Sequence, residues 1–424
     1  MTALVGVVRA PVTVSRRYLA AGTFIALGLI DIFVFGLFAH RGDAVFALSL
    51  PGATPHVPSI RVPGAATCYV LGAISVGLGV LRAVVDVSLR AKRLTIAIVL
   101  LCFLLSLLSW ADAGNSVGAL EVVDLLQGTL IASIPLVLGA LAGLLGERAG
   151  VINIAIEGQL LFGAFTAAAV ASVTGGVWYG LIGGSLAGGL LGALLAIFAI
   201  MFLVDQIIVG VVLNVIALGL TNYLYNRVMV PYAATFNAGN TFGTIKVPVL
   251  SNIPIIGPVF FDSNVFLYIT YALILVIQIA LFRTRWGLRV RAVGEHPTAA
   301  DTVGIRVLWT RYRNVILGGL VAGIGGAYLT VGSVGFFTSD ISSGFGYIAL
   351  AAMIFGRWTP LGSVAAALLF GFSFQLQTEL SVLRVPVSSF ILLMVPYVAT
   401  IIAVAGLVGR VRPPAADGKP YVKA

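Results

Sequence analysis

Long apolar segments recur along almost the whole chain of 424 residues, and they limit what it can fold into. Most of them reach the length of about 18 residues or more that crosses a bilayer as a helix. Charged residues make up only 9% of the chain, against about 25% in soluble proteins. We therefore predict an all-α, polytopic membrane helix bundle of roughly 9–12 transmembrane helices. A β-barrel is excluded, because alternating segments of about ten residues are absent.

The positions of the apolar runs predict where the chain crosses the membrane. The expected spans are about Tyr18–Ala39, Thr67–Ser88, Leu94–Trp110, Val122–Leu145, Ile156–Val173, Trp178–Val204, Ile207–Tyr225, Asn264–Phe282, Asn314–Val331, Gly344–Phe355, Leu361–Gln377 and Pro386–Leu407. The run Gly344–Phe355 is short for a span at about 1.5 Å per residue, so it is either a crossing or half of a broken or re-entrant helix. Residues Asn226 to Ser263 are expected to form a long external segment.

The basic residues predict which side each end of the chain occupies. Arg9, Arg16 and Arg17 precede the first span, and the tail carries Arg412 and Lys419 among its basic residues. Cytoplasmic loops carry an excess of Lys and Arg, so both termini are expected in the cytoplasm. The net charge of +10 is explained by arginines at helix ends, and no nucleic-acid partner is expected. Cys68 and Cys102 lie in apolar runs, which favours packing as small hydrophobes over a disulfide or a metal site.

The arginine-rich loop Arg283–Arg313 is the longest basic segment between two apolar runs. Its seven arginines face only two carboxylates, Glu295 and Asp301. Pro297 favours a helix start and Gly304 a stop two turns later, with Ala299 and Ala300 keeping the surface between them small. A helix of two turns is marginal alone in water, so it is expected to pack against something, such as another protein. The alternative is a loop that only sets topology.

A second polar segment, Gly146 to Gly158, lies between two strongly apolar runs and reads GERAGVINIAIEG. Glu147 and Arg148 are expected at the cytoplasmic end of one span. Asn153 and Glu157 are four residues apart and share a face if this stretch is helical. A carboxylate at the start of a membrane helix is costly unless it is paired, buried in protein or hydrated. Glu157 therefore either contacts a solute or has a structural role, pairing with an arginine or capping backbone N–H groups.

Small residues recur every four positions in two of the predicted spans. Gly184, Gly188 and Gly192 form one series, and Gly319 with Gly323 and Ala322 with Gly326 form the other. Such stripes allow helix backbones to approach closely in lipid. They predict compact packing and carry no information about a solute.

These segments together resemble the membrane subunit of ATP-binding-cassette (ABC) importers, in the branched-chain amino acid, ribose and nucleoside permease family. The stretch GERAGVINIAIEGQLLFGAF is similar to permeases of the nucleoside or simple-sugar subgroup. RAVGEHPTAADTVGI resembles the cytoplasmic loop that holds the coupling helix, and GFGYIALAAMIFGRWTPLGS resembles a late segment of the family. The superfamily pattern Glu-Ala-Ala, three residues, Gly stands here as Thr298, Ala299, Ala300 and Gly304, so Thr298 departs from it.

The resemblance implies that the chain is a transport subunit and not an enzyme. It lacks the G-x-x-x-x-G-K-[ST] phosphate loop, so no cofactor is expected in this chain and ATP is used by a separate ATPase subunit. The residues expected to contact that ATPase are Gly294, Glu295, Pro297, Thr298, Ala299, Ala300, Asp301 and Gly304. The other expected partners are a second permease in a heterodimeric pore, an extracytoplasmic substrate-binding lipoprotein and membrane lipid. The expected location is the bacterial plasma membrane.

The resemblance also suggests three parts. These are an N-terminal extension of about three transmembrane helices in residues 1–117, a permease core in residues 118–410 and a cytoplasmic tail in residues 411–424. The expected function is a permease for a nucleoside or simple sugar in an ATP-driven importer.

Polar residues inside apolar runs are the candidates for the solute path. They are Asn153, Glu157, Gln159, Asn214, Asn222, Gln278 and Gln375. Amides suit a neutral, hydroxyl-rich solute because they both donate and accept hydrogen bonds, although hydrogen bonds between helices are the alternative for each of them. The rival function is a proton-coupled secondary transporter of a small polar solute, with Asp31, Glu157 or Asp205 as proton relays.

Overall fold

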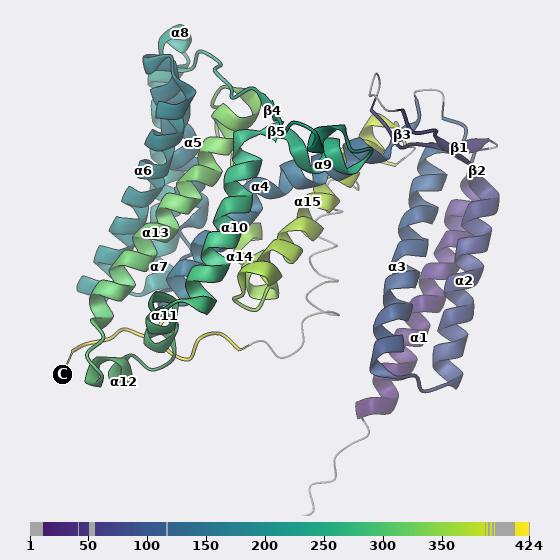
Figure 1. Cartoon of the computed structure of the whole chain (residues 1–424), viewed down its shortest axis with the longest axis horizontal. Helices are drawn as coiled ribbons and strands as arrows, with labels where there is room; N and C mark the ends of the chain where they lie inside the picture. The colour runs from purple at the N-terminus through teal and green to yellow at the C-terminus, as the bar shows by residue number, and fades with distance from the viewer. Residues whose placement is uncertain are drawn as a thin grey trace, which may run out of the picture. The chain divides into compact units, whose positions relative to one another are not determined.

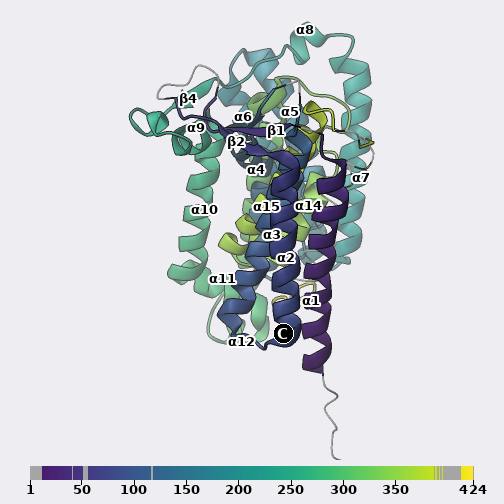
Figure 2. The ribbon, with the colours of Figure 1, turned by 90° about the vertical axis from the view of Figure 1, so that its right-hand side faces the viewer.

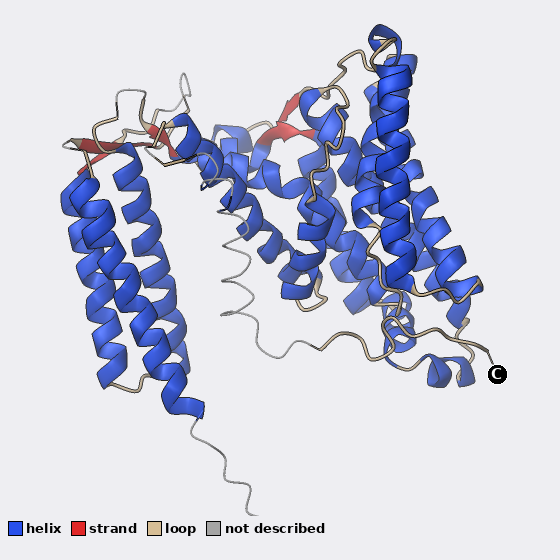
Figure 3. Ribbon diagram, turned by 180° about the vertical axis from the view of Figure 1, so that it is seen from behind, coloured by secondary structure: helices blue, strands red, loops and turns tan. Residues whose placement is uncertain are grey.

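The computed structural model describes residues 12–40, 42–50, 56–115, 118–385, 387–388, 391, 394 and 412–423. Within them ten helices are long and apolar enough to cross a membrane, which confirms the predicted helical membrane bundle. Figure 3 shows how few strands accompany these helices. The predicted last span, Pro386–Leu407, lies almost entirely outside the described residues. The chain divides into two compact units, Met1–Asp124 with Thr378–Leu392, and Leu125–Gln377 with Leu393–Ala424.

The long helices follow the predicted spans closely. They are α1 (Val12–Ile30), α2 (Gly64–Val84), α3 (Leu89–Asp112), α4 (Val122–Glu147), α5 (Ile156–Thr174), α6 (Val177–Ala196), α7 (Gln206–Leu224), α10 (Val265–Arg283), α13 (Val307–Ala327) and α15 (Pro360–Val382). Four of them continue into π-helical turns at Asp31–Gly36, Ile197–Met201, Tyr225–Met229 and Tyr328–Val334. The shorter helices are α8 (Ala233–Phe236), α9 (Ile256–Phe261), α11 (Arg285–Glu295), α12 (Pro297–Thr302) and α14 (Phe345–Phe355).

The first unit contains α1, α2 and α3, which run side by side (Figures 1 and 2). A small sheet lies among their connections. In it β1 (Asp43–Ala47) pairs antiparallel with β2 (Ile60–Pro63) and parallel with β3 (Leu120–Glu121). Cys68 and Cys102 are both buried in this bundle, as predicted for small apolar side chains.

The core of the second unit forms where α4, α5, α6 and α13 meet. The glycine stripes have their predicted effect here. A Cβ atom at Gly188 would lie 2.4 Å from the carbonyl oxygen of Gly319, and one at Gly323 would lie 2.3 Å from that of Gly184. The α6 and α13 backbones are therefore in direct contact, which larger residues at these positions would prevent.

The segment predicted as a long external loop, Asn226 to Ser263, is partly ordered into short elements. It contains α8, α9, a 3₁₀ turn at Leu250–Asn252 and β4 (Thr244–Lys246), which pairs antiparallel with β5 (Asp262–Asn264). The short apolar run near residue 350 forms α14, with 11 residues. At about 1.5 Å per residue α14 is roughly 16 Å long, about half of the hydrocarbon thickness of a bilayer.

Candidate functional site

The N-terminus of α14 is held by a carboxylate from α5. Oε1 of Glu157 accepts hydrogen bonds from Ser342 Oγ at 2.6 Å and from Gly344 N at 2.9 Å. Its Oε2 accepts a third from Gly346 N at 2.6 Å. We refer to Glu157, Ser342, Gly344 and Gly346 as the α14 cap. A negative charge at this end is favourable, because the first N–H groups of a helix have no partner within it and the helix dipole is positive there.

Glycine is required at two positions of the α14 cap. Gly344 has φ +84°, a left-handed conformation that favours glycine. A Cβ atom at Gly346 would lie 2.4 Å from the backbone N of Glu157. The two helices therefore meet at a distance that excludes any side chain at Gly346. Because Glu157 is only 8% exposed, this carboxylate acts as a structural cap, one of the two roles that the sequence left open.

The side-chain amide of Asn214, on α7, joins that helix to α14 and to the start of α5. Asn214 accepts a hydrogen bond from Gly158 N at 2.8 Å through its Oδ1 and donates to the carbonyl oxygen of Ile154 at 2.9 Å. It also donates to the hydroxyl of Tyr347 on α14 at 3.3 Å. Tyr347 is half exposed, so this cluster has one polar side chain that reaches a surface. Asn214 thus contacts the first turn of α5, which also carries Glu157.

Asn153 and Gln159 bond to each other. The Nδ2 of Asn153 donates to Oε1 of Gln159 at 3.1 Å, and both side chains are fully buried. Asn153 and Glu157 were expected to share a face only if this stretch is helical, and that condition is not met, because α5 begins at Ile156 and Asn153 belongs to the preceding turn. This turn is also held by Gln206, whose Oε1 accepts a hydrogen bond from Ile152 N at 2.7 Å.

The other three candidate path residues are on α7, α10 and α15. Asn222, on α7, accepts a hydrogen bond from Ser339 Oγ at 2.6 Å. Gln278, on α10, has a buried Oε1 atom without a hydrogen-bond partner in the described structure. Gln375, on α15, lies against Gly128 of α4, where a Cβ atom would be 2.2 Å from its Cδ. The structure therefore brings Glu157 and Asn214 together around α14 and pairs Asn153 with Gln159.

Of the proposed proton relays outside this cluster, Asp205 has a local structural role. Its Oδ1 accepts from Ile207 N at 2.9 Å and from Ile208 N at 3.1 Å, which makes it the N-cap of α7. Asp31 is fully buried within the separate three-helix unit. The carboxylates considered as relays are thus distributed over three different places in the fold.

The arginine-rich loop folds as the sequence predicts, with one difference. The helix α12 starts at Pro297 and ends at Thr302, and Gly304 follows with φ +83°. Ala299 is exposed, but Ala300 is only 3% exposed and packs with Val293, Val307 and Tyr421. The expectation that both alanines form the outer surface is therefore wrong for Ala300. The surface of this helix is formed by residues such as Thr298, Ala299 and Thr302.

The C-terminal tail, residues 412–423, packs along this loop. Ala416 N donates to the carbonyl oxygen of Gly294 at 2.9 Å, and Ala415 N donates to Oε2 of Glu295 at 3.2 Å. Arg311 Nη1 donates to the carbonyl oxygen of Lys419 at 2.9 Å. Figure 1 shows the C-terminal residues beside α12. The short helix α12 was expected to need a packing partner. The C-terminal tail of the same chain supplies part of that partner.

The loop also contacts the turns that follow α4 and α14. A Cβ atom at Gly294 would lie 2.3 Å from the carbonyl oxygen of Arg148, so the two backbones touch. Arg148 Nε donates to the carbonyl oxygen of Trp358 at 2.7 Å, and Trp358 Nε1 donates to Glu147. Burial lowers the pKa of Arg148 from its ordinary value. A continuous set of contacts therefore joins the loop to the C-terminal end of α14.

Several of these contacts were missed from the sequence. The glycine pair Gly344 and Gly346, directly before an apolar run, was the available signal for a close approach at the start of α14. Tyr421 was the signal in the tail, as an aromatic residue in a basic, Pro-containing segment. Neither signal names its partner, because Glu157 and Ala300 are far away in sequence.

Comparison with known proteins gives consistent matches over the second unit. Residues 125–404 match the family model described as branched-chain amino acid transport system / permease component. The guanosine ABC transporter permease protein NupQ of Bacillus subtilis is 38% identical over 322 residues, which cover 72% of this chain and 99% of NupQ. The nucleoside ABC transporter permease protein NupC of Lactococcus lactis is 37% identical over 324 residues, or 73% of this chain and 99% of NupC.

A more distant relative comes from an archaeon. TsgC13 of Haloferax volcanii, whose name assigns it provisionally to glucose transport, is 34% identical over 253 residues, or 60% of this chain and 76% of that protein. No solved structure gives a significant match. The family match begins at residue 125, so α1, α2 and α3 lie outside it.

Proposed function

This chain belongs to the branched-chain amino acid transport system permease component family, and we propose that it forms the translocation path for a nucleoside or a simple sugar in an ATP-driven importer. The observation that carries the proposal is its identity of 38% and 37%, over almost the full length of each relative, to permeases named for guanosine and nucleosides. The chain is a multi-pass membrane protein that serves as a transport component, and it is not an enzyme.

A permease of this kind works with an ATPase subunit, because it has no phosphate loop of its own. We place the ATPase contact on the outer surface of the arginine-rich loop, where Thr298 and Ala299 are exposed on α12. ATP is then bound by the partner, and this chain needs no cofactor. A second, different permease subunit and an extracytoplasmic lipoprotein that delivers the solute complete the proposed assembly.

The proposed coupling route runs from the loop to the α14 cap. Movement of Gly294 is passed to the Arg148 backbone, which it touches, and from Arg148 to Trp358 through a hydrogen bond. Trp358 lies just after α14, and a half-length helix tends to move as a rigid body. The motion therefore reaches Glu157 at the other end of α14. Alternating access would follow from two positions of α14 relative to α5.

The solute path is proposed beside the exposed side of this cluster. Tyr347 offers a hydroxyl, which donates and accepts hydrogen bonds as a neutral, hydroxyl-rich solute requires, and the buried Asn214 positions that hydroxyl by donating to it. Glu157 stabilises the position of α14, and in this proposal it has no direct contact with the solute. Gln278 and Gln375 are kept as secondary candidates.

The orientation in the membrane follows from the charge of the loop. The excess of arginine between α10 and α13 favours the cytoplasm. Because Ala416 bonds to Gly294, the C-terminal tail lies on the same side as the loop. We propose that the N-terminus, which carries Arg16 and Arg17, is cytoplasmic as well.

Uptake measurements test this proposal. The full chain is expressed with the subunits that co-purify with it, and accumulation of radiolabelled guanosine, ribose and glucose is followed in intact cells. We expect guanosine accumulation to fall to background when the catalytic Glu of the ATPase is replaced by Gln, and a protonophore to leave the initial rate nearly unchanged. Accumulation that survives the ATPase variant and is abolished by the protonophore would instead establish the proton-coupled alternative.

A further inference from the structure

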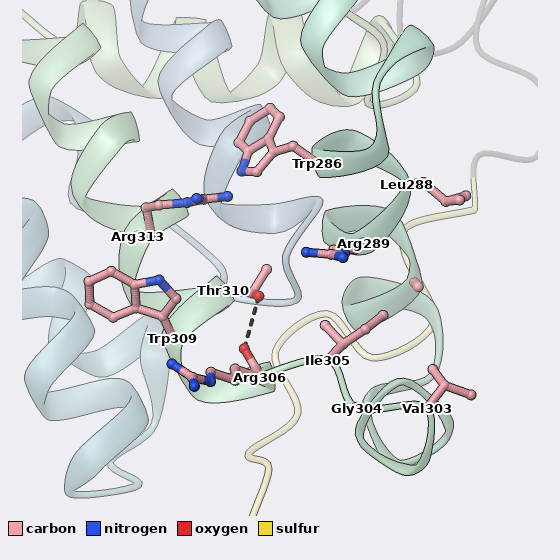
Figure 4. Close-up of a pocket in the computed structure, with 11 residues that line it drawn as sticks. Trp286, Leu288, Arg289, Val303, Gly304, Ile305, Arg306, Trp309, Thr310 and Arg313 are labelled. Carbon is pink, nitrogen blue, oxygen red and sulfur yellow. Dashed lines mark hydrogen bonds between the residues drawn. The ribbon is translucent and has the colours of Figure 1, made fainter.

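A cavity of about 710 Å³ lies between α11, the link that follows α12 and the first turns of α13. Arg289, Arg306 and Arg313 line it together with Trp286 and Trp309 (Figure 4). We refer to this cavity as the arginine pocket. Its lining contains no carboxylate. The side chains of Arg289 and Arg313 extend into the cavity from opposite walls.

The three arginines form no close ion pair within the part of the chain that the structure describes. The ion pairs found there are Lys92–Asp86 and Lys246–Asp262, and neither involves an arginine of this pocket. The Nε atom of Arg313 is buried and has no hydrogen-bond partner among the described residues. Its guanidinium carbon lies 5.4 Å from the centre of the Trp286 ring, which orients the group.

Three like charges around one cavity repel one another, and an anion between them removes that repulsion. Phosphate oxygens suit the site, because a guanidinium group donates two parallel hydrogen bonds to them. Arg313 approaches from α13 and Arg289 from α11. A single phosphate group could therefore bridge the two helices that flank α12.

The position of the pocket relative to the spans points to a lipid as the source of the phosphate. The apolar helix α10 ends at Arg283 and the apolar helix α13 begins at Val307. The pocket lies beside these two helix ends, so we place it near the membrane surface. Trp309 is 63% exposed and Leu288 is 62% exposed. Tryptophan and exposed apolar side chains next to basic residues are typical of the headgroup region, where anionic lipids concentrate.

We propose that the arginine pocket binds the phosphate-bearing headgroup of an anionic phospholipid in the leaflet on the side of the arginine-rich loop. The acyl chains lie outside the cavity, against Leu288 and Trp309. The bound headgroup holds α11 against α13 and so fixes the position of α12 between them. This inference requires only that α10 and α13 span the membrane. It does not depend on the identity of the solute or of the ATPase.

Lipid retention tests the proposal directly. The full-length wild-type chain is compared with the double variant Arg289→Gln/Arg313→Gln and with the matched control Arg283→Gln/Arg285→Gln, which removes two exposed arginines of the same loop outside the pocket. Each of the three proteins is placed in nanodiscs of equal parts phosphatidylcholine and phosphatidylglycerol. The lipid that stays tightly bound is then counted by native mass spectrometry. We expect wild type and control to retain phosphatidylglycerol and the pocket variant to retain about tenfold less or lower still.

A second measurement needs no variant. Quenching of tryptophan fluorescence in the wild-type chain is compared between brominated phosphatidylglycerol and brominated phosphatidylcholine, because Trp286 and Trp309 line the pocket. We expect stronger quenching by the anionic lipid, and no reversal of it by inorganic phosphate at physiological concentration.

Three outcomes would overturn the proposal. Equal retention by the pocket variant would show that these arginines do not select the lipid. Loss of the lipid signal on adding inorganic phosphate would make the pocket a site for soluble phosphate. Unchanged lipid retention together with loss of ATPase co-purification would assign the pocket to the interface with the ATPase.

Discussion

The α14 cap and the arginine pocket are both concentrations of charge and polarity near helix ends, but they differ in how their groups are satisfied. At the cap, one carboxylate receives three donors from residues 342–346 of its own chain. At the pocket, three guanidinium groups face one cavity with no carboxylate in its lining. A cluster with all its partners inside the chain positions helices. A cluster without them is suited to a molecule that the chain does not supply.

This difference assigns separate roles to two segments that look equally polar in sequence. The cap fixes one end of α14, so changes there should reduce stability and transport together. The pocket and the outer surface of α12 face outward, so changes there should affect binding and leave stability nearly unchanged. Each of the following predictions can break this distinction.

The largest effect is expected for Glu157→Leu. The substitution removes the acceptor of three donors, two of them buried, and a buried donor costs roughly 1–3 kcal/mol when left unpaired. We expect a marked fall in the unfolding temperature of the purified chain and transport at background level. Thermal unfolding in detergent and guanosine uptake measure the two effects.

Two variants serve as comparisons for that result. Glu157→Gln keeps one acceptor oxygen and should give an intermediate loss of stability. Gly219→Ala adds a methyl group on α7 where nothing lies within 4 Å, and it should leave both properties unchanged. Full stability and full transport in Glu157→Leu would show that the cap does not hold α14.

The sequence predicted the position of α12 correctly but predicted neither α11 nor which side of α12 faces inward. Pro297 and Gly304 set the ends of that helix through local backbone preferences, which a sequence reveals directly. The inward position of Ala300 depends on Tyr421, more than a hundred residues later. Similarly, the partners of Glu157 lie 185 to 189 residues away. Apolar runs predict spans, whereas contacts between distant segments follow from packing that no local pattern encodes.

Neighbouring alanines on α12 provide the next test. In Ala300→Glu, a carboxylate would be buried among Val293, Val307 and Tyr421, which should destabilise this region by on the order of 2 kcal/mol. In Ala299→Glu, the same group would be exposed, and the change in stability should stay within about 0.5 kcal/mol. We expect the Ala299 variant to lose the co-purifying ATPase while its unfolding temperature remains that of wild type.

Hydrogen–deuterium exchange of residues 293–307 distinguishes these cases. Exchange in the Ala300 variant should rise across the region, and exchange in the Ala299 variant should match wild type. Equal exchange in both variants would mean that the inner and outer faces of α12 are not energetically different. Normal ATPase binding by Ala299→Glu would remove the proposed contact surface.

The C-terminal tail is intermediate between the fully hydrogen-bonded α14 cap and the arginine pocket. One of its carboxyl groups, that of Asp417, is buried but incompletely hydrogen-bonded. Burial raises the pKa of Asp417 from its ordinary value of 3.8 to about 7, against a smaller opposing effect of its hydrogen bonds and of the nearby Arg311 charge. A detached tail has the ordinary value. Between the two values the docked tail binds more protons than the detached tail does, so the docked state is favoured at low pH. This contribution is lost as the pH rises through about 7.

We therefore expect the tail to dock less tightly as the pH rises from about 5 to 8, by at most about 1.4 kcal/mol for each pH unit. A spin label on Val422→Cys reports this change, because Val422 is exposed and both native cysteines are buried. Its mobility should increase with pH in the otherwise wild-type chain and stay nearly constant with Asp417→Asn added, since the amide does not titrate. The effect should be the smallest of the three, because only residues 412–423 are released while α14 and its cap stay in place. If both proteins respond alike, another group controls the tail. If mobility falls as the pH rises, Asp417 is stabilised as a carboxylate in the docked state, and the tail belongs with the fully partnered cap.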